Sequence, residues 1–94
     1  MGSGRFPAVQ VVVLVDAAPG FEGSVEASLR RVNGVTSVIR HKQGNFDLAV
    51  LVEVSDPALL ERLLTNELRT ISGVRGLERV GEPDAALLQR FPAK

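Results

Sequence analysis

The sequence has no cysteine, tryptophan or tyrosine, and it has a single histidine among its 94 residues. The lack of cysteine excludes disulfide bonds, thiolate catalysis and metal sites built on sulfur. One histidine, with neither tyrosine nor cysteine to help it, leaves an enzyme few groups for acid–base work. Asp16, Glu53 and Glu78 form no recognisable acid–base or metal-ligand constellation in the sequence. We therefore expect no catalytic residue, no metal site and no cofactor.

An excess of charge of either sign is also absent. Lysine and arginine number 11, aspartate and glutamate number 11, and the longest basic run is Arg30-Arg31. Nucleic-acid binding depends on clustered cations that displace counterions, so direct nucleic-acid binding is not expected. The longest apolar run, Val11 to Val15, has five residues, whereas a membrane span needs about 20. With no signal peptide either, the sequence predicts a cytoplasmic protein without membrane contact.

Apolar residues make up 45% of the chain, which is typical of a folded globular protein. The length suits one small domain and is too short for two. We expect a flexible N-terminus at residues 1–7, one domain at residues 8–81 and a C-terminal tail at residues 82–94. Domains of this size bury a modest share of their surface, so association with a second copy would add stability.

The centre of the sequence is predicted to form a β-hairpin. The runs VTSVIRHKQ and FDLAVLVEV meet at Gly44-Asn45, a two-residue turn signal because both residues tolerate positive φ. Pairing Gln43 with Phe46 then places Lys42 opposite Asp47. Because alternate residues share a face, the predicted core face comprises Val35, Ser37, Ile39, Phe46, Leu48, Val50, Val52 and Val54. The other face comprises Thr36, Val38, Arg40, Lys42, Asp47, Ala49, Leu51 and Glu53.

Turn and capping signals divide the rest of the chain into short elements. Asn33-Gly34 and Ser72-Gly73 each stop a helix, and Asp56-Pro57 starts one with an N-cap residue followed by proline. The expected order is a strand at Ala8 to Val15, a helix carrying Phe21 to Val32, the hairpin, a helix carrying Leu60 to Ile71, a strand at Val74 to Val80 and a short helix at Ala85 to Phe91.

An internal repeat supports one particular arrangement of these elements. Val32-Asn33-Gly34-Val35 and Ile71-Ser72-Gly73-Val74 share the pattern apolar, polar, glycine, valine. Two βαβ halves joined by the hairpin predict an α+β, ferredoxin-like βαββαβ fold, with a four-stranded antiparallel sheet and two helices on one face, of the dimeric αβ-barrel type. The first and third strands would be central.

The first strand is apolar on both faces, so the side of the sheet without helices also needs a cover. We expect a second copy of the chain to provide it, sheet against sheet or edge to edge. The alternative is that the C-terminal segment folds back over the sheet.

Gly44-Asn45-Phe46-Asp47 resembles the hairpin turn of the effector-binding domain in the leucine-responsive regulator (Lrp)/AsnC family, also called the RAM domain. That turn carries the pattern Gly-x-x-Asp after an apolar strand. The resemblance extends to Pro19-Gly20, Gly34-Val35, Asp56 and Ile71-Ser72-Gly73-Val74, and it covers about residues 8 to 81. Full members also carry a DNA-binding domain, which is not expected here because about seven residues precede the first strand.

The resemblance implies a regulatory domain that binds a small effector, usually an amino acid, near Gly44, Asn45, Phe46 and Asp47. It also implies a homo-oligomer, as a dimer or as a ring such as an octamer. A full-length Lrp/AsnC regulator is the partner expected under the adaptor alternative. In the fourth strand, Arg75-Gly76-Leu77-Glu78-Arg79 stands where many members have threonines. A ligand contact from that strand is therefore not implied.

Alternatives to this function remain open. An ACT-type amino-acid sensor shares the fold, and an adaptor without a ligand would only assemble with a regulator. Asp47 itself has two interpretations: it accepts the ammonium group of an effector, or it forms a cross-strand ion pair with Lys42. His41 is interpreted as a solvated strand residue.

Overall fold

The computed structural model describes residues 9–81 and 85–91. The predicted flexible N-terminus, residues 1–7, and part of the predicted tail lie outside this range. The elements, in order, are β1 (Val9–Ala17), α1 (Glu22–Arg30), β2 (Val35–Gln43), β3 (Phe46–Val54), α2 (Pro57–Arg62), a π-helical segment (Leu63–Leu68), β4 (Val74–Val80) and α3 (Ala85–Gln89).

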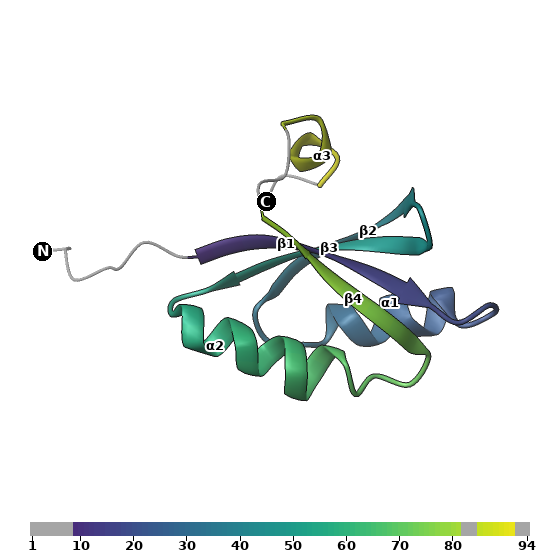
Figure 1. The fold of residues 1–94 in the computed structure, drawn as a ribbon, viewed down its shortest axis with the longest axis horizontal. Helices are drawn as coiled ribbons and strands as arrows, with labels where there is room; N and C mark the ends of the chain where they lie inside the picture. Colours follow the sequence, from purple (N-terminus) through teal and green to yellow (C-terminus); the bar gives the residue numbers. More distant parts are fainter. Residues whose placement is uncertain (1–8, 82–84, 92–94) are drawn as a thin grey trace, which may run out of the picture.

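The strands form one antiparallel sheet in the order β2-β3-β1-β4, so the first and third strands are central as predicted. Helices α1 and α2 lie on one side of the sheet, and α3 lies on the other side (Figure 1). This is the predicted ferredoxin-like βαββαβ fold, with one further helix at the C-terminal end. No helix within the described residues is long and apolar enough to cross a membrane.

The main core lies between the sheet and helices α1 and α2. Because β1 is apolar at every position from Val11 to Val15, it contributes to this core and to a second cluster on the opposite face. The buried residues of the main core are Val13, Val15, Ala17, Val25, Leu29, Val38, Leu48, Val50, Val52, Leu60, Leu63 and Leu68.

The helix boundaries follow the capping signals of the sequence. The Asp56 carboxylate accepts a hydrogen bond from Ala58 N at 2.9 Å, and Pro57 is the first helical residue. Gly73 ends the second helical stretch with φ near 99°, and a Cβ placed there would lie 2.9 Å from the Phe21 Cβ. Only glycine fits this close approach without displacing a neighbour.

The second helical stretch widens from α2 into a π-helix at Leu63–Leu68, a feature not predicted from the sequence. Arg69 N donates to Leu64 O at 3.1 Å, five residues back. Leu63 and Leu68 are also five residues apart, and the wider turn lets both point into the core. The predicted inner stripe, with Leu60, Leu63 or Leu64, Leu68 and Ile71, therefore packs against the sheet.

The predicted register of the hairpin is wrong beyond its first pair. Gln43 pairs with Phe46 as expected, but β2 carries one extra residue between Arg40 and Gln43 and another between Val35 and Ser37. Each extra residue shifts the side-chain alternation by one position. Val38 therefore faces the helices and Ile39 faces away from them, the reverse of the prediction.

The face of the sheet away from α1 and α2, here called the outer face, carries the second cluster. Phe91 lies on it with 7% of its surface exposed and packs with Val12, Leu14 and Ala49. The C-terminal segment therefore folds back over the sheet, which was the alternative to cover by a second copy. Self-association stays a prediction.

Candidate functional site

The candidate site lies at the turn between β2 and β3, where the side chain of Asp47 points back toward the end of β1. Gly44 has φ near 59°, which a two-residue hairpin turn requires. The Asp47 Oδ1 accepts a hydrogen bond from Lys42 Nζ at 3.1 Å, and Oδ2 accepts one from Ala17 N at 3.1 Å. The Asp47 side chain is 18% exposed, whereas that of Lys42 is 73% exposed.

These contacts decide the protonation of the carboxyl group. Burial alone would raise the pKa of Asp47, but the hydrogen bonds from Lys42 and from Ala17 N lower it, helped by the positive charges of Lys42 and Arg75. The net result is a pKa below the usual range for aspartate. Asp47 is therefore a carboxylate at neutral pH, with lone pairs left over because two oxygens can accept about four hydrogen bonds.

Asp47 lines a polar cavity of about 340 Å³ formed where β1 ends and the hairpin turns. Three acidic and two basic side chains meet there, so the cavity offers partners of both signs to a ligand. Its lining residues are Asp16, Ala17, Pro19, Glu22, Lys42, Asn45, Asp47 and Arg75.

The structure brings together part of the predicted site. Asn45 and Asp47 line the cavity and Gly44 forms the turn beside it. Phe46 is not among the lining residues; it packs against the outer-face cluster instead. Ligand binding by these four residues stays a prediction; at this cavity the structure places Asn45 and Asp47 in the lining and Phe46 outside it.

Several cavity residues were not assigned to a site from the sequence. From the sequence, Asp16 fits no metal or acid–base constellation, and no ligand contact is implied for the strand that carries Arg75, yet both residues line the cavity. The signal that could have found Asp16 is topological. In an antiparallel pair the end of β1 lies beside the start of β3, and Val15 indeed pairs with Leu48.

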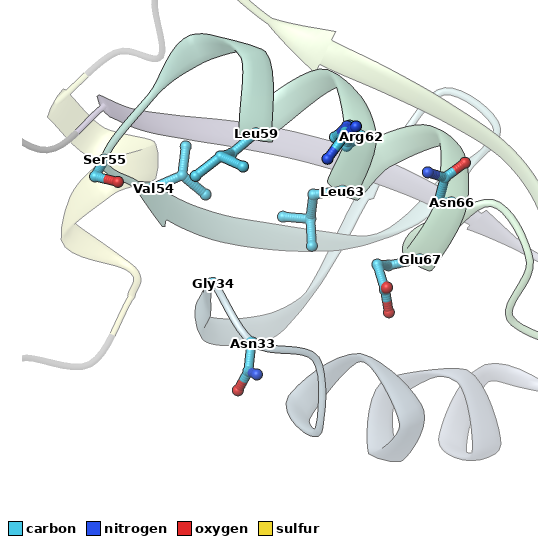
Figure 2. Close-up of a pocket in the computed structure, with 9 residues that line it drawn as sticks. All are labelled: Asn33, Gly34, Val54, Ser55, Leu59, Arg62, Leu63, Asn66 and Glu67. Atoms are coloured by element: carbon cyan, nitrogen blue, oxygen red, sulfur yellow. The ribbon is translucent and has the colours of Figure 1, made fainter.

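A larger cavity, about 470 Å³, lies at the opposite end of the hairpin (Figure 2). It is bounded by the π-helical segment and the turn that precedes β2, and it has a floor that includes Val54 and Leu63. Arg62, Asn66 and Glu67 come from the helix, and all three side chains are exposed. Because none of the polar side chains in this lining is fixed by hydrogen bonds as that of Asp47 is, we place the candidate site at the smaller cavity.

Metal chemistry finds no support in the described part of the chain. Among residues 9–81 and 85–91, no three histidine, aspartate or glutamate side chains are grouped so that they could hold a metal ion. The acidic residues of the Asp47 cavity instead face lysine and arginine, which favours a ligand that carries both charges.

Comparison with family models gives no match, and comparison with curated proteins gives none either. Solved structures do share the fold. FFRP-DM1 is 22% identical, with a TM-score of 0.71 over 77% of this chain and 95% of that one. Escherichia coli AsnC is 16% identical, with a TM-score of 0.69 over 85% of this chain and 59% of AsnC.

Two further structures show how widely the fold is used. A transcriptional regulator of Neisseria meningitidis in complex with L-methionine is 17% identical, with a TM-score of 0.64 over 90% of this chain and 49% of the regulator. The E. coli Tat proofreading chaperone NapD is 18% identical, with a TM-score of 0.69 over 84% of this chain and 81% of NapD. At these identities the comparisons establish the ferredoxin-like fold, which Lrp/AsnC-type structures share.

Proposed function

We propose that this chain is an effector-binding regulatory domain of the Lrp/AsnC (RAM) type, that its effector is a free amino acid, and that the effector binds in the Asp47 cavity. The observation that carries the proposal is the Asp47 carboxylate, which is mostly buried, ionised and fixed by two hydrogen bonds at the edge of a polar cavity. The fold shared with AsnC and with a methionine-bound regulator supports the choice of ligand.

The cavity matches the two charges of an α-amino acid. The ammonium group would donate to the lone pairs that Asp47 has left, as a charge-assisted hydrogen bond. The carboxylate of the ligand would meet Lys42 or Arg75, which line the same cavity. Because Lys42 is largely exposed, it can turn from Asp47 to the ligand without leaving a buried charge unpaired.

Thermal-shift measurements against the twenty amino acids test the proposal. A ligand at 100 times its dissociation constant adds about 2.7 kcal/mol to the free energy of unfolding, so a true effector raises the melting temperature clearly. Asp47→Asn should abolish that rise. Glu61→Gln, which removes the partner of Arg79 on the exposed part of α2, should preserve it.

Failure of all twenty amino acids to raise the melting temperature at millimolar concentration would contradict the sensor function. It would favour the adaptor instead, a domain that assembles with a full-length regulator and binds no effector. An ACT-type sensor would still respond to an amino acid, but Asp47→Asn would leave its response intact.

We further propose that the domain binds and does not catalyse, and that it acts in the cytoplasm as an oligomer. The C-terminal segment lies on the outer face, so assembly edge to edge is the form that leaves this segment in place. The edge strands are β2 and β4. Equilibrium sedimentation at low micromolar concentration tests this part of the proposal, and a monomer would contradict it.

A further inference from the structure

Residues 85–91 of the same chain contact the outer face of the sheet through an aromatic anchor and a polar contact. Helix α3 lies on the side of the sheet opposite α1 and α2 (Figure 1). Phe91, two residues beyond α3, is the buried anchor, and Val12, Leu14 and Ala49 form its seat on the two central strands. The seat is therefore built from β1 and β3, the two inner strands of the sheet.

Arg90 adds a polar contact next to the aromatic anchor. Its guanidinium donates to the Arg40 backbone oxygen at 3.1 Å and to His41 Nδ1 at 2.7 Å. Arginine only donates, so His41 accepts through Nδ1 and carries its hydrogen on Nε2, which lies 3.1 Å from Gln43 Oε1. Both acceptors lie on β2, near the position where it carries an extra residue.

The segment has little structure of its own to keep it there. Helix α3 has five residues, none of them buried, and isolated helices shorter than about 12 residues are marginal in water. Leu88 remains 38% exposed. A cavity of about 310 Å³ persists between the segment and the sheet, with Leu51, Leu88 and Phe91 in its lining. The contact thus depends mainly on Phe91 and Arg90, with Leu87 packed beside them against the same cluster, and the fit around them is incomplete.

We propose that the outer face is a recognition surface for a short helical peptide of a partner protein, and that residues 85–91 occupy it as an internal stand-in. The partner segment has an aliphatic helical turn followed by a basic residue and an aromatic one, the pattern of Leu87 to Phe91. The aromatic ring takes the Phe91 seat, and the basic group takes the two acceptors on β2. A buried aromatic anchor beside a charge-assisted contact is the usual composition of a binding hot spot.

The internal segment sets the affinity for such a partner. When a site is open for only a fraction of the time, its apparent dissociation constant is the intrinsic one divided by that fraction, so the stand-in weakens binding until it is displaced. This surface lies on the sheet, away from the Asp47 cavity, and the proposal does not depend on an amino-acid effector.

Fluorescence anisotropy with a labelled synthetic peptide of residues 83–94 tests the proposal on the full chain. Phe91→Ala vacates the seat, so it should bind this peptide at least tenfold more tightly than the wild type does. Leu88→Ala, which changes an exposed position of the same segment, should bind like the wild type. A peptide that carries Phe91→Ala itself should bind neither protein.

Should Phe91→Ala prove unfolded by circular dichroism, Arg90→Ala replaces it, because it removes the hydrogen bonds and keeps the aromatic ring. It should then bind the peptide at least threefold more tightly than the wild type. Equal affinity of the wild type and the folded variant would overturn the proposal. So would a variant that dimerises without binding the peptide, since a second copy would then be the occupant of the outer face.

Discussion

Replacing Asp47 with alanine removes two hydrogen bonds, whereas replacing Lys42 with alanine removes one. The Asp47 carboxylate bridges the β2–β3 turn and the end of β1, through Lys42 Nζ and Ala17 N at 3.1 Å each. An exposed ion pair taken alone would make the two variants almost equally stable. The contact with Ala17 predicts that they differ.

The size of the difference follows from burial. Ala17 is 3% exposed, so its N–H would lose its acceptor with little access to water. Leaving such a donor unpaired costs about 1–3 kcal/mol. Lys42→Ala breaks a pair whose lysine is 73% exposed, which is worth about 0.2–1 kcal/mol. Both variants lose this pair, so Asp47→Ala should lower the free energy of unfolding by about 1–3 kcal/mol more than Lys42→Ala does.

Urea unfolding at pH 7, followed by circular dichroism, measures both values. Each kcal/mol corresponds to a change in melting temperature of about 4–8 °C for a domain of this size. Asp47→Asn is the matched control, because its amide oxygen can still accept from Ala17 N while the charge is gone. Equal stability of Asp47→Ala and Lys42→Ala, within about 0.5 kcal/mol, would refute the role of the Ala17 contact.

The Asp47→Asn variant also gives a prediction for how stability depends on pH. The folded-state pKa of Asp47 is lowered, so its charge stabilises the folded chain at pH values above the unfolded pKa of about 3.9. That contribution is lost as the pH falls through the lower folded-state value. The difference in stability between the wild type and Asp47→Asn should be constant near neutral pH and should shrink toward zero in acid.

Three other variants test the packing and the caps. Gly73→Ala should destabilise the chain by about 1–3 kcal/mol more than Gly44→Ala, because a new Cβ at Gly73 meets Phe21 at 2.9 Å while Gly44 has open space around it; equal losses in urea unfolding would contradict this. Asp56→Ala should cost about 1 kcal/mol through loss of the N-cap, and an unchanged urea midpoint would show that the cap is not needed. Hydrogen bonds from Arg30 and Arg40 lower the pKa of Glu26, although burial acts in the opposite direction. Glu26→Gln should therefore be less stable than the wild type at pH 7 and equally stable in acid. A difference in stability that stays constant across pH would argue against the ion pairs.

Most of the fold could be predicted from the sequence because its signals are local and strong. Val74 to Val80 was predicted as a strand and forms β4 with those bounds. The start of α2 is marked by the N-cap hydrogen bond of Asp56, and the ends of the two helical stretches are marked by the positive φ of Gly34 and Gly73. These effects depend on a few neighbouring residues. The order of the strands followed from the repeat and from the apolar character of β1 and β3.

The register of β2 could not be predicted in the same way. In β3, the alternating pattern determines which side chains face the helices, and Leu48, Val50 and Val52 all do so. In β2 the pattern is weaker, and Val38 and Ile39 are adjacent apolar residues, either of which could face the core. The two extra residues of β2 decide which of them faces the core, and the sequence of β2 alone does not reveal where these residues lie.

The candidate site shows the same division between topology and detail. The end of β1 lies between the start of β3 and the start of β4, so this strand order brings Asp16, Asp47 and Arg75 to the same end of the sheet. The hydrogen bond between Ala17 N and Asp47 depends on a local irregularity as well as on the strand order. The pairing of β1 with β4 shifts register between Asp16 and Ala17, and the pairing with β3 ends at Val15, so the Ala17 N–H is available to a side chain. Because of this shift in register, the Asp47 carboxylate is held by Ala17 N as well as by Lys42. Asp47 is therefore the residue at which effector binding is best tested.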